Sequence, residues 1–465
     1  MRKHESDRAI RAVIHAYKLG GFNIVLDIAS GCIHSVDDVA YDAISALMYE
    51  SESVAVEQIK TRYRDISDED ISALFEEIAQ LKRRGALFST DNYGEIEKEK
   101  STELKALCLN ISHLCNMNCA YCFAGSGDYG GGEGLMSIET AMRAIDFLVE
   151  NSGSKNTLDI DFFGGEPLLN WGVVKEVVKY ARGVEREHGK KFRFTLTTNG
   201  LLIDDDVIEF TCEQMHNVVL SLDGRAKTND LHRLLADGSG SYNVIVPKLK
   251  KLVSAREGKG YYIRGTFTKQ NCDFVNDILH IADLGFKEIS LEPVVSKPGE
   301  LLAFSDGDLP ELLNQYQLLA VKMLEEIKEG RGFAFYHFTL DLTGGPCVHK
   351  RIAGCGVGTE YMAVTPGGKL YPCHQFVGDE EFVLGDIWSG IKNNKLREDF
   401  GKWNIYSRPE CRGCWARLYC SGGCAANAYY DTGSLGSVYK IGCELFKKRL
   451  ECAIMIKVGT YQNEV

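Results

Sequence analysis

The sequence lacks any long run of apolar residues. No stretch approaches the ~18 consecutive apolar residues that a membrane-spanning helix requires. The first residues, MRKHESDRAIRAVIHAYKLGG, are basic, but they contain no apolar segment of the length found in signal peptides. We therefore expect a cytoplasmic protein without a membrane partner.

Basic residues are also too few to dominate the surface. Lys and Arg total 53 against 65 Asp and Glu, which gives a formal net charge of −12. Because nucleic-acid-binding proteins usually carry clustered positive charge, this balance argues against a nucleic-acid partner. The chain has 465 residues and 45% apolar content, enough for about three globular domains.

Cysteine, in contrast, is abundant. The chain contains 16 cysteines, and four of them lie in the short run CRGCWARLYCSGGC. Disulfides are rare in a reducing cytoplasm, so this many thiols indicates metal or redox chemistry.

Three regions of the chain differ in pattern. Residues 1–95 combine strand-like runs with three helical patterns, and Ser67 stands in a good N-cap position before the third. This predicts a small α+β module. Residues 105–330 alternate six strand candidates with amphipathic helical runs, as in a parallel sheet with crossover helices. Residues 340–452 contain nine cysteines and show little hydrophobic periodicity. We therefore expect metal clusters, instead of a large apolar core, to stabilise this region.

The middle region predicts an α/β fold of one of two kinds. Six strand–helix units are too few for a closed eight-stranded barrel, so a partial barrel or a doubly wound sheet is expected. In both folds the functional residues lie at the C-terminal ends of the strands.

The first cysteine cluster follows the first strand of this region, in ISHLCNMNCAYCFAG. Cys115, Cys119 and Cys122 have the spacing C-x3-C-x2-C. Three thiolates can hold three irons of a cubane cluster and leave the fourth iron open, which is what a catalytic metal centre needs. A zinc loop with a remote fourth ligand is the alternative.

This motif, with Tyr121 in its aromatic position, resembles the signature of the radical S-adenosylmethionine (SAM) superfamily. The resemblance implies a partial (β/α)6 TIM-like barrel and a catalytic [4Fe–4S] cluster that binds SAM. It also implies reductive cleavage of SAM to a 5′-deoxyadenosyl radical, which takes a hydrogen atom from the substrate. The electron would come from a donor such as flavodoxin or ferredoxin.

Motifs at the ends of later strands extend the resemblance over about residues 105–300. A GGEP stretch resembles the segment whose backbone binds the SAM amino group, and glycine does let a backbone approach a ligand closely. Arg264 is a possible carboxylate partner, although a structural or solvated arginine is equally compatible with its position. The SAM contacts that the resemblance implies are Tyr121, Gly164, Gly165, Glu166, Pro167, Asn199, Ser221, Asp223, Arg264 and Val294.

The C-terminal cysteines resemble the SPASM extension of radical SAM enzymes that modify peptides and proteins. This resemblance implies two auxiliary [4Fe–4S] clusters, and so three clusters in all, whereas zinc knuckles are the alternative for C-x2-C pairs. The implied ligands are Cys411, Cys414, Cys420 and Cys443 for an outer cluster, and Cys355, Cys373 and Cys424 for an inner one. Cys347 either closes the inner cluster or leaves one iron open to a substrate thiolate.

The residue after Cys373 bears on the choice between two activities. Anaerobic sulfatase-maturing enzymes, which resemble this chain, use an Asp base at that position, and His374 stands there instead. His374 could act as a base, because its unperturbed pKa lies near neutrality, or it could form a hydrogen bond beside the cluster.

The whole architecture resembles maturases of ribosomal peptides rich in cysteine, including those that act on six-cysteine (SCIFF-type) peptides. The N-terminal module resembles a winged-helix-like domain that binds a precursor leader as an added strand, and a nucleic-acid-binding winged helix is the alternative. The implied reaction is a thioether cross-link of the sactionine or ranthipeptide type. Another oxidation, such as formylglycine formation, is the alternative activity.

Overall fold

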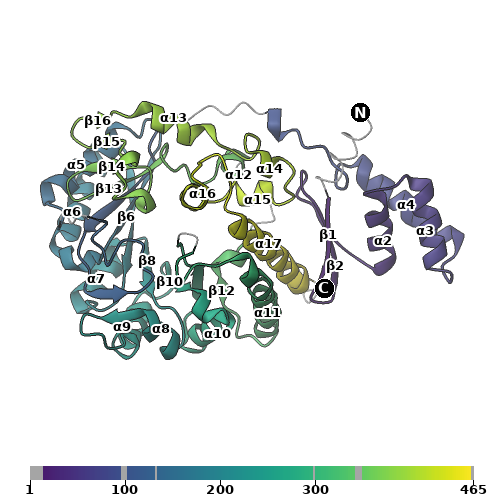
Figure 1. Ribbon diagram of the computed structural model, residues 1–465, viewed down its shortest axis with the longest axis horizontal. Helices are drawn as coiled ribbons and strands as arrows, with labels where there is room; N and C mark the ends of the chain where they lie inside the picture. The colour runs from purple at the N-terminus through teal and green to yellow at the C-terminus, as the bar shows by residue number, and fades with distance from the viewer. Residues whose placement is uncertain (1–13, 96–101, 131–133, 297–298, 341–347, 462–465) are drawn as a thin grey trace.

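The computed structural model describes residues 14–95, 102–130, 134–296, 299–340 and 348–461 (Figure 1). Its centre is a sheet of eleven strands in the order β12-β11-β10-β8-β7-β6-β4-β13-β14-β15-β16. Six of these form the parallel middle of the sheet: β4 (Ala106–Ser112), β6 (Thr157–Gly164), β7 (Lys191–Thr198), β8 (Asn217–Ser221), β10 (Tyr261–Phe267) and β11 (Glu288–Pro293).

The order of the parallel strands decides between the two predicted folds. They follow one another in chain order, so the sheet winds in one direction and curves into a partial barrel. A doubly wound sheet needs a reversal of strand order, and that alternative is therefore wrong.

Helices cover the outer face of the curved sheet and form the rim of the molecule in Figure 1. They include α5 (Ile138–Glu150), α6 (Trp171–His188), α7 (Asp205–Gln214), α9 (Tyr242–Ala255), α10 (Phe274–Asp283) and α11 (Leu309–Lys328). In strand β6, alternate residues face opposite sides of the sheet. Leu158, Ile160 and Phe162 are fully buried in the main core, whereas Asp161 and Phe163, on the alternate face, line cavities inside the barrel.

The C-terminal region extends the barrel sheet. Strand β13 (Tyr361–Val364) pairs in parallel with β4, and β14 (Lys369–Tyr371), β15 (Gly385–Asp386) and β16 (Gly390–Ile391) continue the sheet as antiparallel strands. At the opposite edge β12 (Ala334–Phe335) pairs with β11. The region's helices are α12 (Val348–Ala353), α13 (Asn394–Lys402), α14 (Pro409–Arg412), α15 (Arg417–Cys420), α16 (Ala425–Thr432) and α17 (Lys440–Tyr461), of which α17 packs against α11.

The N-terminal module consists of an antiparallel sheet and three helices. Strands β1 (Ile14–Leu19), β2 (Phe22–Asp27) and β3 (Ile33–Val36) precede α2 (Asp38–Leu47), α3 (Glu52–Arg62) and α4 (Asp68–Arg83). Ser67 caps α4 as predicted, since its hydroxyl accepts a hydrogen bond from the Asp70 amide. Both faces of the sheet are covered: Val25 packs against the module's own helices, and Ile24 and Leu26 join the main core.

Among the helices of the described residues, none combines the length and apolar character that a membrane span requires.

Candidate active site

The first three predicted cluster ligands follow β4: Cys115 precedes the short strand β5 (Met117–Cys119), Cys119 ends it, and Cys122 lies just after it. Strand β5 pairs with β9 (Arg233–Leu235). Burial raises the pKa of the Cys115 thiol to about 11, and the nearby Glu166, Cys119 and Cys122 add to the shift. The structure therefore brings Cys115, Cys119 and Cys122 into one neighbourhood at the C-terminal end of the barrel.

Two glycines hold this loop against the end of β6. Gly164 has φ +122°, and a Cβ at Gly165 would lie 2.2 Å from the carbonyl oxygen of Leu114. The Gly165 amide instead donates to Ser112 O (2.7 Å), and the Glu166 amide donates to Leu114 O (2.9 Å). The GGEP stretch thus fixes the cysteine loop through its backbone, and only glycine allows this approach.

Glu166 is almost fully buried and joins the ends of neighbouring strands. Its carboxylate accepts hydrogen bonds from the Thr198 hydroxyl and the Asn199 amide, both at 2.8 Å. Burial raises the pKa of Glu166, and these hydrogen bonds oppose the shift. Asn199 in turn donates to Asn116 (2.7 Å) and lies 3.8 Å from the Cys115 sulfur, so Glu166 positions Asn199 at the cysteine loop.

A buried triad lies on the other side of the loop. The Tyr121 hydroxyl donates to Asp223 (2.7 Å) and accepts from Arg233 (3.0 Å). Arg233 pairs in register with Cys119 and is 7% exposed, which places a fixed positive charge beside the cysteines. Sequence reasoning missed Arg233, because no motif marks it and its short strand forms only through β5.

An inner cavity of about 440 Å³ brings most of the predicted residues together. Its lining combines the first cysteine loop, residues of five barrel strands and two segments of the C-terminal region. Among the predicted residues it contains Cys115, Cys119, Cys122, Tyr121, Gly164, Gly165, Glu166, Pro167, Asn199, Ser221, Arg264, Val294, His374 and Cys424. Asp223 is outside this lining, but it accepts a hydrogen bond from Tyr121, which lines the cavity.

Two charged residues on neighbouring strands face the inner cavity. Arg264 of β10 forms no hydrogen bond or ion pair with any part of the chain that the structure describes, so its guanidinium is available to a carboxylate. Glu292, which sequence reasoning missed, lies at the end of β11 and pairs with His337 at 2.9 Å. Burial alone would raise the pKa of Glu292, but His337 and Arg449 hold it below its ordinary value.

His374 also borders the inner cavity. Its Nδ1 lies 3.2 Å from the Tyr361 hydroxyl, and its ring lies against those of Phe163 and Phe123. Burial lowers the pKa of His374 to about 4, with the charge of Arg264 acting in the same direction. His374 is therefore neutral near physiological pH, which is compatible with a hydrogen-bonding role and makes it a weak base.

The C-terminal cysteines fall into two groups. Burial raises the pKa of Cys420 to about 12, and the neighbouring Cys443, Cys414 and Cys411 add to the shift. Cys424, only four residues later, belongs to a different group: burial raises the pKa of Cys373, and there the neighbouring thiols are Cys424 and Cys355. Cys347 lies outside the described residues.

These groups have the donor chemistry of iron–sulfur ligands. Amides of Gln375 and Phe376 point at Cys373, and those of Asn427 and Ala426 at Cys424, as N–H groups do around cluster sulfurs. Within the described ranges no three His, Cys, Asp or Glu side chains converge on one metal ion. In a cubane each cysteine binds a different iron, so its ligands stand farther apart than those of a single ion.

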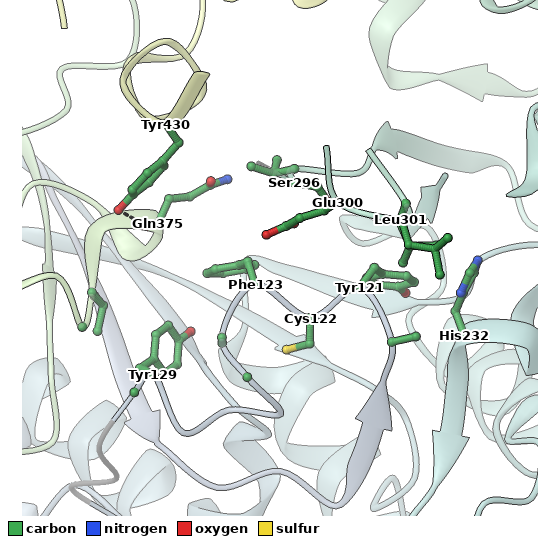
Figure 2. Close-up of a pocket in the computed structure, with 18 of the residues that line it drawn as sticks. Tyr121, Cys122, Phe123, Tyr129, His232, Ser296, Glu300, Leu301, Gln375 and Tyr430 are labelled. Carbon is green, nitrogen blue, oxygen red and sulfur yellow. Dashed lines mark hydrogen bonds between the residues drawn. The ribbon is translucent and has the colours of Figure 1, made fainter. Parts of the chain in front are cut away.

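An outer cavity of about 900 Å³ adjoins the inner one (Figure 2). The two share the wall formed by Tyr121, Cys122 and Phe123. Glu300 and Gln375 face each other across the opening, one from the segment after β11 and one from the C-terminal region. The pair of cavities is large enough to admit a peptide segment to the cysteine loop.

Comparison with known proteins agrees with this geometry. Residues 109–265 match the radical SAM superfamily. The chain is 24% identical over 392 residues to the radical SAM cyclopropyl synthase TigE of Paramaledivibacter caminithermalis, covering 77% of this chain and 76% of TigE. It is 25% identical over 370 residues to a cysteine-type anaerobic sulfatase-maturating enzyme of Clostridium novyi, covering 75% and 94% of the two chains.

Solved structures show the same fold. The enzyme anSMEcpe with bound AdoMet and the Cp18Cys peptide has a TM-score of 0.62 at 22% identity, covering 78% of this chain and all of its own. Streptococcus suis SuiB bound to its precursor peptide SuiA has a TM-score of 0.51 at 16% identity and covers 93% of this chain and 98% of its own.

The superfamily match supports SAM and a [4Fe–4S] cluster as cofactors, and the cysteine loop at the barrel mouth has the ligands to hold that cluster. Taken with the sheet topology and the cysteine groups, the comparisons identify residues 109–265 as a radical SAM domain and support a relationship of the chain to radical SAM/SPASM peptide maturases.

Proposed function

We propose that this enzyme installs thioether cross-links in a cysteine-rich ribosomal precursor peptide. The observation that carries the proposal is the inner cavity, which has the Cys115–Cys122 loop on one side and Cys424 on the other. A peptide side chain in this cavity would lie between the site of radical formation and the inner auxiliary cluster.

The chain's own residues would prepare both reactants. Arg264 lines the inner cavity and would bind the SAM carboxylate, and the buried Glu166 holds Asn199 beside the cysteine loop. Cys115, Cys119 and Cys122 would hold the cluster that supplies one electron to SAM, and this chemistry would provide a 5′-deoxyadenosyl radical able to remove a hydrogen atom from a peptide carbon.

The cross-linking step then balances without a further oxidant. The peptide thiol would give up its proton, its sulfur would bond to the carbon radical, and the surplus electron would pass to an auxiliary cluster. Each cross-link therefore removes two hydrogen atoms from the peptide, one in 5′-deoxyadenosine and one as a proton. A donor such as flavodoxin or ferredoxin would supply the first electron.

The N-terminal module would bind the leader of such a precursor. Both faces of its sheet are covered, and in the described residues β1 and β3 each pair only with β2. Strand addition at an edge of this sheet would tether the leader and raise the effective concentration of the core peptide at the barrel mouth.

Formylglycine formation is the second candidate, because the chain is similar to a cysteine-type anaerobic sulfatase-maturating enzyme and, in fold, to anSMEcpe with a bound peptide. His374 argues against it, since it stands where the sulfatase-maturing group has an Asp base and its pKa is low.

One experiment separates these activities. The reconstituted enzyme is incubated anaerobically, with reductant and SAM, with the product of a small cysteine-rich reading frame beside its gene and with a sulfatase peptide. Thioether formation predicts loss of two hydrogens per bridge and loss of alkylatable thiols. Loss of two hydrogens with all thiols still alkylated would instead indicate a carbon–carbon bond, and aldehyde on the sulfatase peptide alone would indicate formylglycine.

The proposed cofactor set predicts about twelve irons per chain, with matching sulfide, for three cubanes. Replacing Cys411 and Cys443 together by Ala should remove about four of them while the SAM-binding cluster remains. Several zinc ions and no iron would contradict the proposal.

A further inference from the structure

The run that carries the outer cysteine group bends between its last two cysteines. Ser421, Gly422 and Gly423 all have left-handed backbone, with φ of +60°, +90° and +76°. Such values favour glycine, and two of the three residues are glycines. The bend lies between Cys420 and Cys424, and it accounts for two cysteines only four residues apart belonging to different groups.

Arg408 is bonded to this bend. Its Nη1 donates to Gly422 O and its Nη2 to Leu435 O, both at 3.1 Å. A Cβ at Gly422 would lie 2.4 Å from Nη1, so this close approach also needs glycine. The Arg408 carbonyl oxygen accepts from the Cys411 amide (3.2 Å). One residue is therefore hydrogen-bonded near both ends of the outer cysteine run.

The guanidinium of Arg408 is a buried cation without a carboxylate partner. The residue is 6% exposed, and both of its side-chain hydrogen bonds in the described part of the chain go to neutral carbonyl groups. Its Nε is buried and has no hydrogen-bond partner among the described residues. Because an isolated buried charge is strongly disfavoured, a fold that keeps one needs an anionic group close to it.

The outer cysteine group suits this charge. Burial lowers the pKa of Arg408, and the thiols of Cys411, Cys420 and Cys443 act against this shift. Glu410 acts in the same direction as the thiols, but it lies exposed at the surface, where solvent and salt screen its charge. The group that faces the buried guanidinium is therefore a set of proposed cluster ligands.

The second cation near the outer thiols, Lys447, is compensated. It pairs with Glu444 at 2.7 Å, and its side chain is 30% exposed. The cysteine run is also covered on the side of the N-terminal module, where His15 stacks on Trp415 with ring centroids 3.5 Å apart. Of these two cations, Arg408 is the one that solvent screens less.

We propose that the positive charge of Arg408 sets the reduction potential of the outer auxiliary cluster by stabilising its reduced, more negatively charged state. This rests on the proposed function, which includes the outer cluster, but not on the kind of cross-link formed. Reduction adds one negative charge to a cubane held by four thiolates, and a buried cation beside it makes that step more favourable. The hydrogen bonds to the bend keep the cation in place.

The test is a redox titration of the reconstituted full-length enzyme, in which the electron paramagnetic resonance signal of the outer cluster is followed. The spectrum of Cys411→Ala/Cys443→Ala, which lacks that signal, identifies it by difference. Arg408→Gln removes the charge, so the midpoint should become more negative and the ratio of reduced to oxidised cluster at a fixed potential should fall about tenfold. Arg408→Lys keeps the charge without the planar fork, and its midpoint should stay close to the wild-type value.

Arg256→Gln is the matched control. Arg256 is also fully buried and donates to backbone carbonyl groups, including Thr211 O (2.7 Å) and Gly260 O (2.6 Å), but it lies at the end of α9 in the barrel. Its replacement should lower thermal stability and leave the midpoint of the outer cluster unchanged. A shift equal to that of Arg408→Gln would show that lost stability moves the midpoint, and would overturn the inference.

The comparison of the two Arg408 variants separates charge from shape. An unchanged midpoint in Arg408→Gln overturns the inference, and so does an equal shift in Arg408→Lys, because the planar fork and not the charge would then matter. If Arg408→Gln does not load the outer cluster, iron content decides. Loss of about four irons in Arg408→Gln alone supports the role of the charge, and the same loss in Arg408→Lys overturns it.

Iron and product analysis keep this result distinct from the proposed function. If Cys411→Ala/Cys443→Ala loses no iron, the outer cluster is absent and both proposals fail. If the wild type forms the cross-link and its outer midpoint does not respond to Arg408, only the present inference fails. A midpoint that responds to Arg408 in an enzyme that leaves the precursor unchanged contradicts only the proposed reaction.

Discussion

Gly165 shows how one residue can control a cofactor site. An added Cβ would clash with Leu114 O at 2.2 Å, and that atom is backbone in the loop before Cys115. Gly165→Ala should therefore displace the loop, cost about 1–3 kcal/mol of stability and abolish most SAM cleavage.

Gly172→Ala in α6 is the matched control, because nothing lies within 4 Å of its added Cβ. Iron content, SAM binding and thermal unfolding of the two variants provide the measurement. Full iron loading and wild-type SAM cleavage in Gly165→Ala would contradict this role of the glycine.

At the same scale, motif residues were predictable and their partners were not. The spacing of Cys115, Cys119 and Cys122 is visible in the sequence because neighbouring ligands share one loop. Arg233 and Glu292 reach the inner cavity only through the pairing of β5 with β9 and the curvature of the sheet. No local pattern marks such residues, since their surroundings come from distant parts of the chain.

At the scale of elements, β6 places an acidic side chain inside the barrel. Burial raises the pKa of Asp161 to about 6, and the charge of Asp159 adds to the shift. Because the folded state resists ionisation, stability is lost as pH rises from the ordinary carboxyl pKa to about 6, by about 3 kcal/mol at most.

Asp161→Asn removes this penalty. The variant should unfold at a higher temperature than the wild type, and its advantage should be larger at pH 7 than at pH 4.5. Thermal unfolding at the two pH values measures the difference. An equal effect at both would show that the ionisation of Asp161 does not affect stability.

The βα alternation predicted the six parallel strands because each unit buries one face against its own helix. The pairing of β13 with β4 was not predictable in this way, since the two strands are separated by the whole barrel. A four-residue strand in a cysteine-rich region also carries too little pattern to reveal its partner.

At the scale of the whole molecule, three parts of the chain meet at the cysteine groups. The barrel supplies the first loop, the extended sheet brings Cys424 and His374 to the same cavity, and the N-terminal module covers the loop of Trp415. The sequence could indicate the three regions, but the contacts between them depend on how the sheet continues past β4.

The central claim is that a peptide in the inner cavity is the substrate of the radical chemistry. It is tested most directly by the fate of hydrogen when the cysteine-rich precursor is deuterated on its carbon atoms and incubated with enzyme, SAM and reductant. The account predicts one deuterium in 5′-deoxyadenosine for each cross-link formed in the peptide. 5′-Deoxyadenosine without deuterium, beside an unchanged precursor, would contradict it.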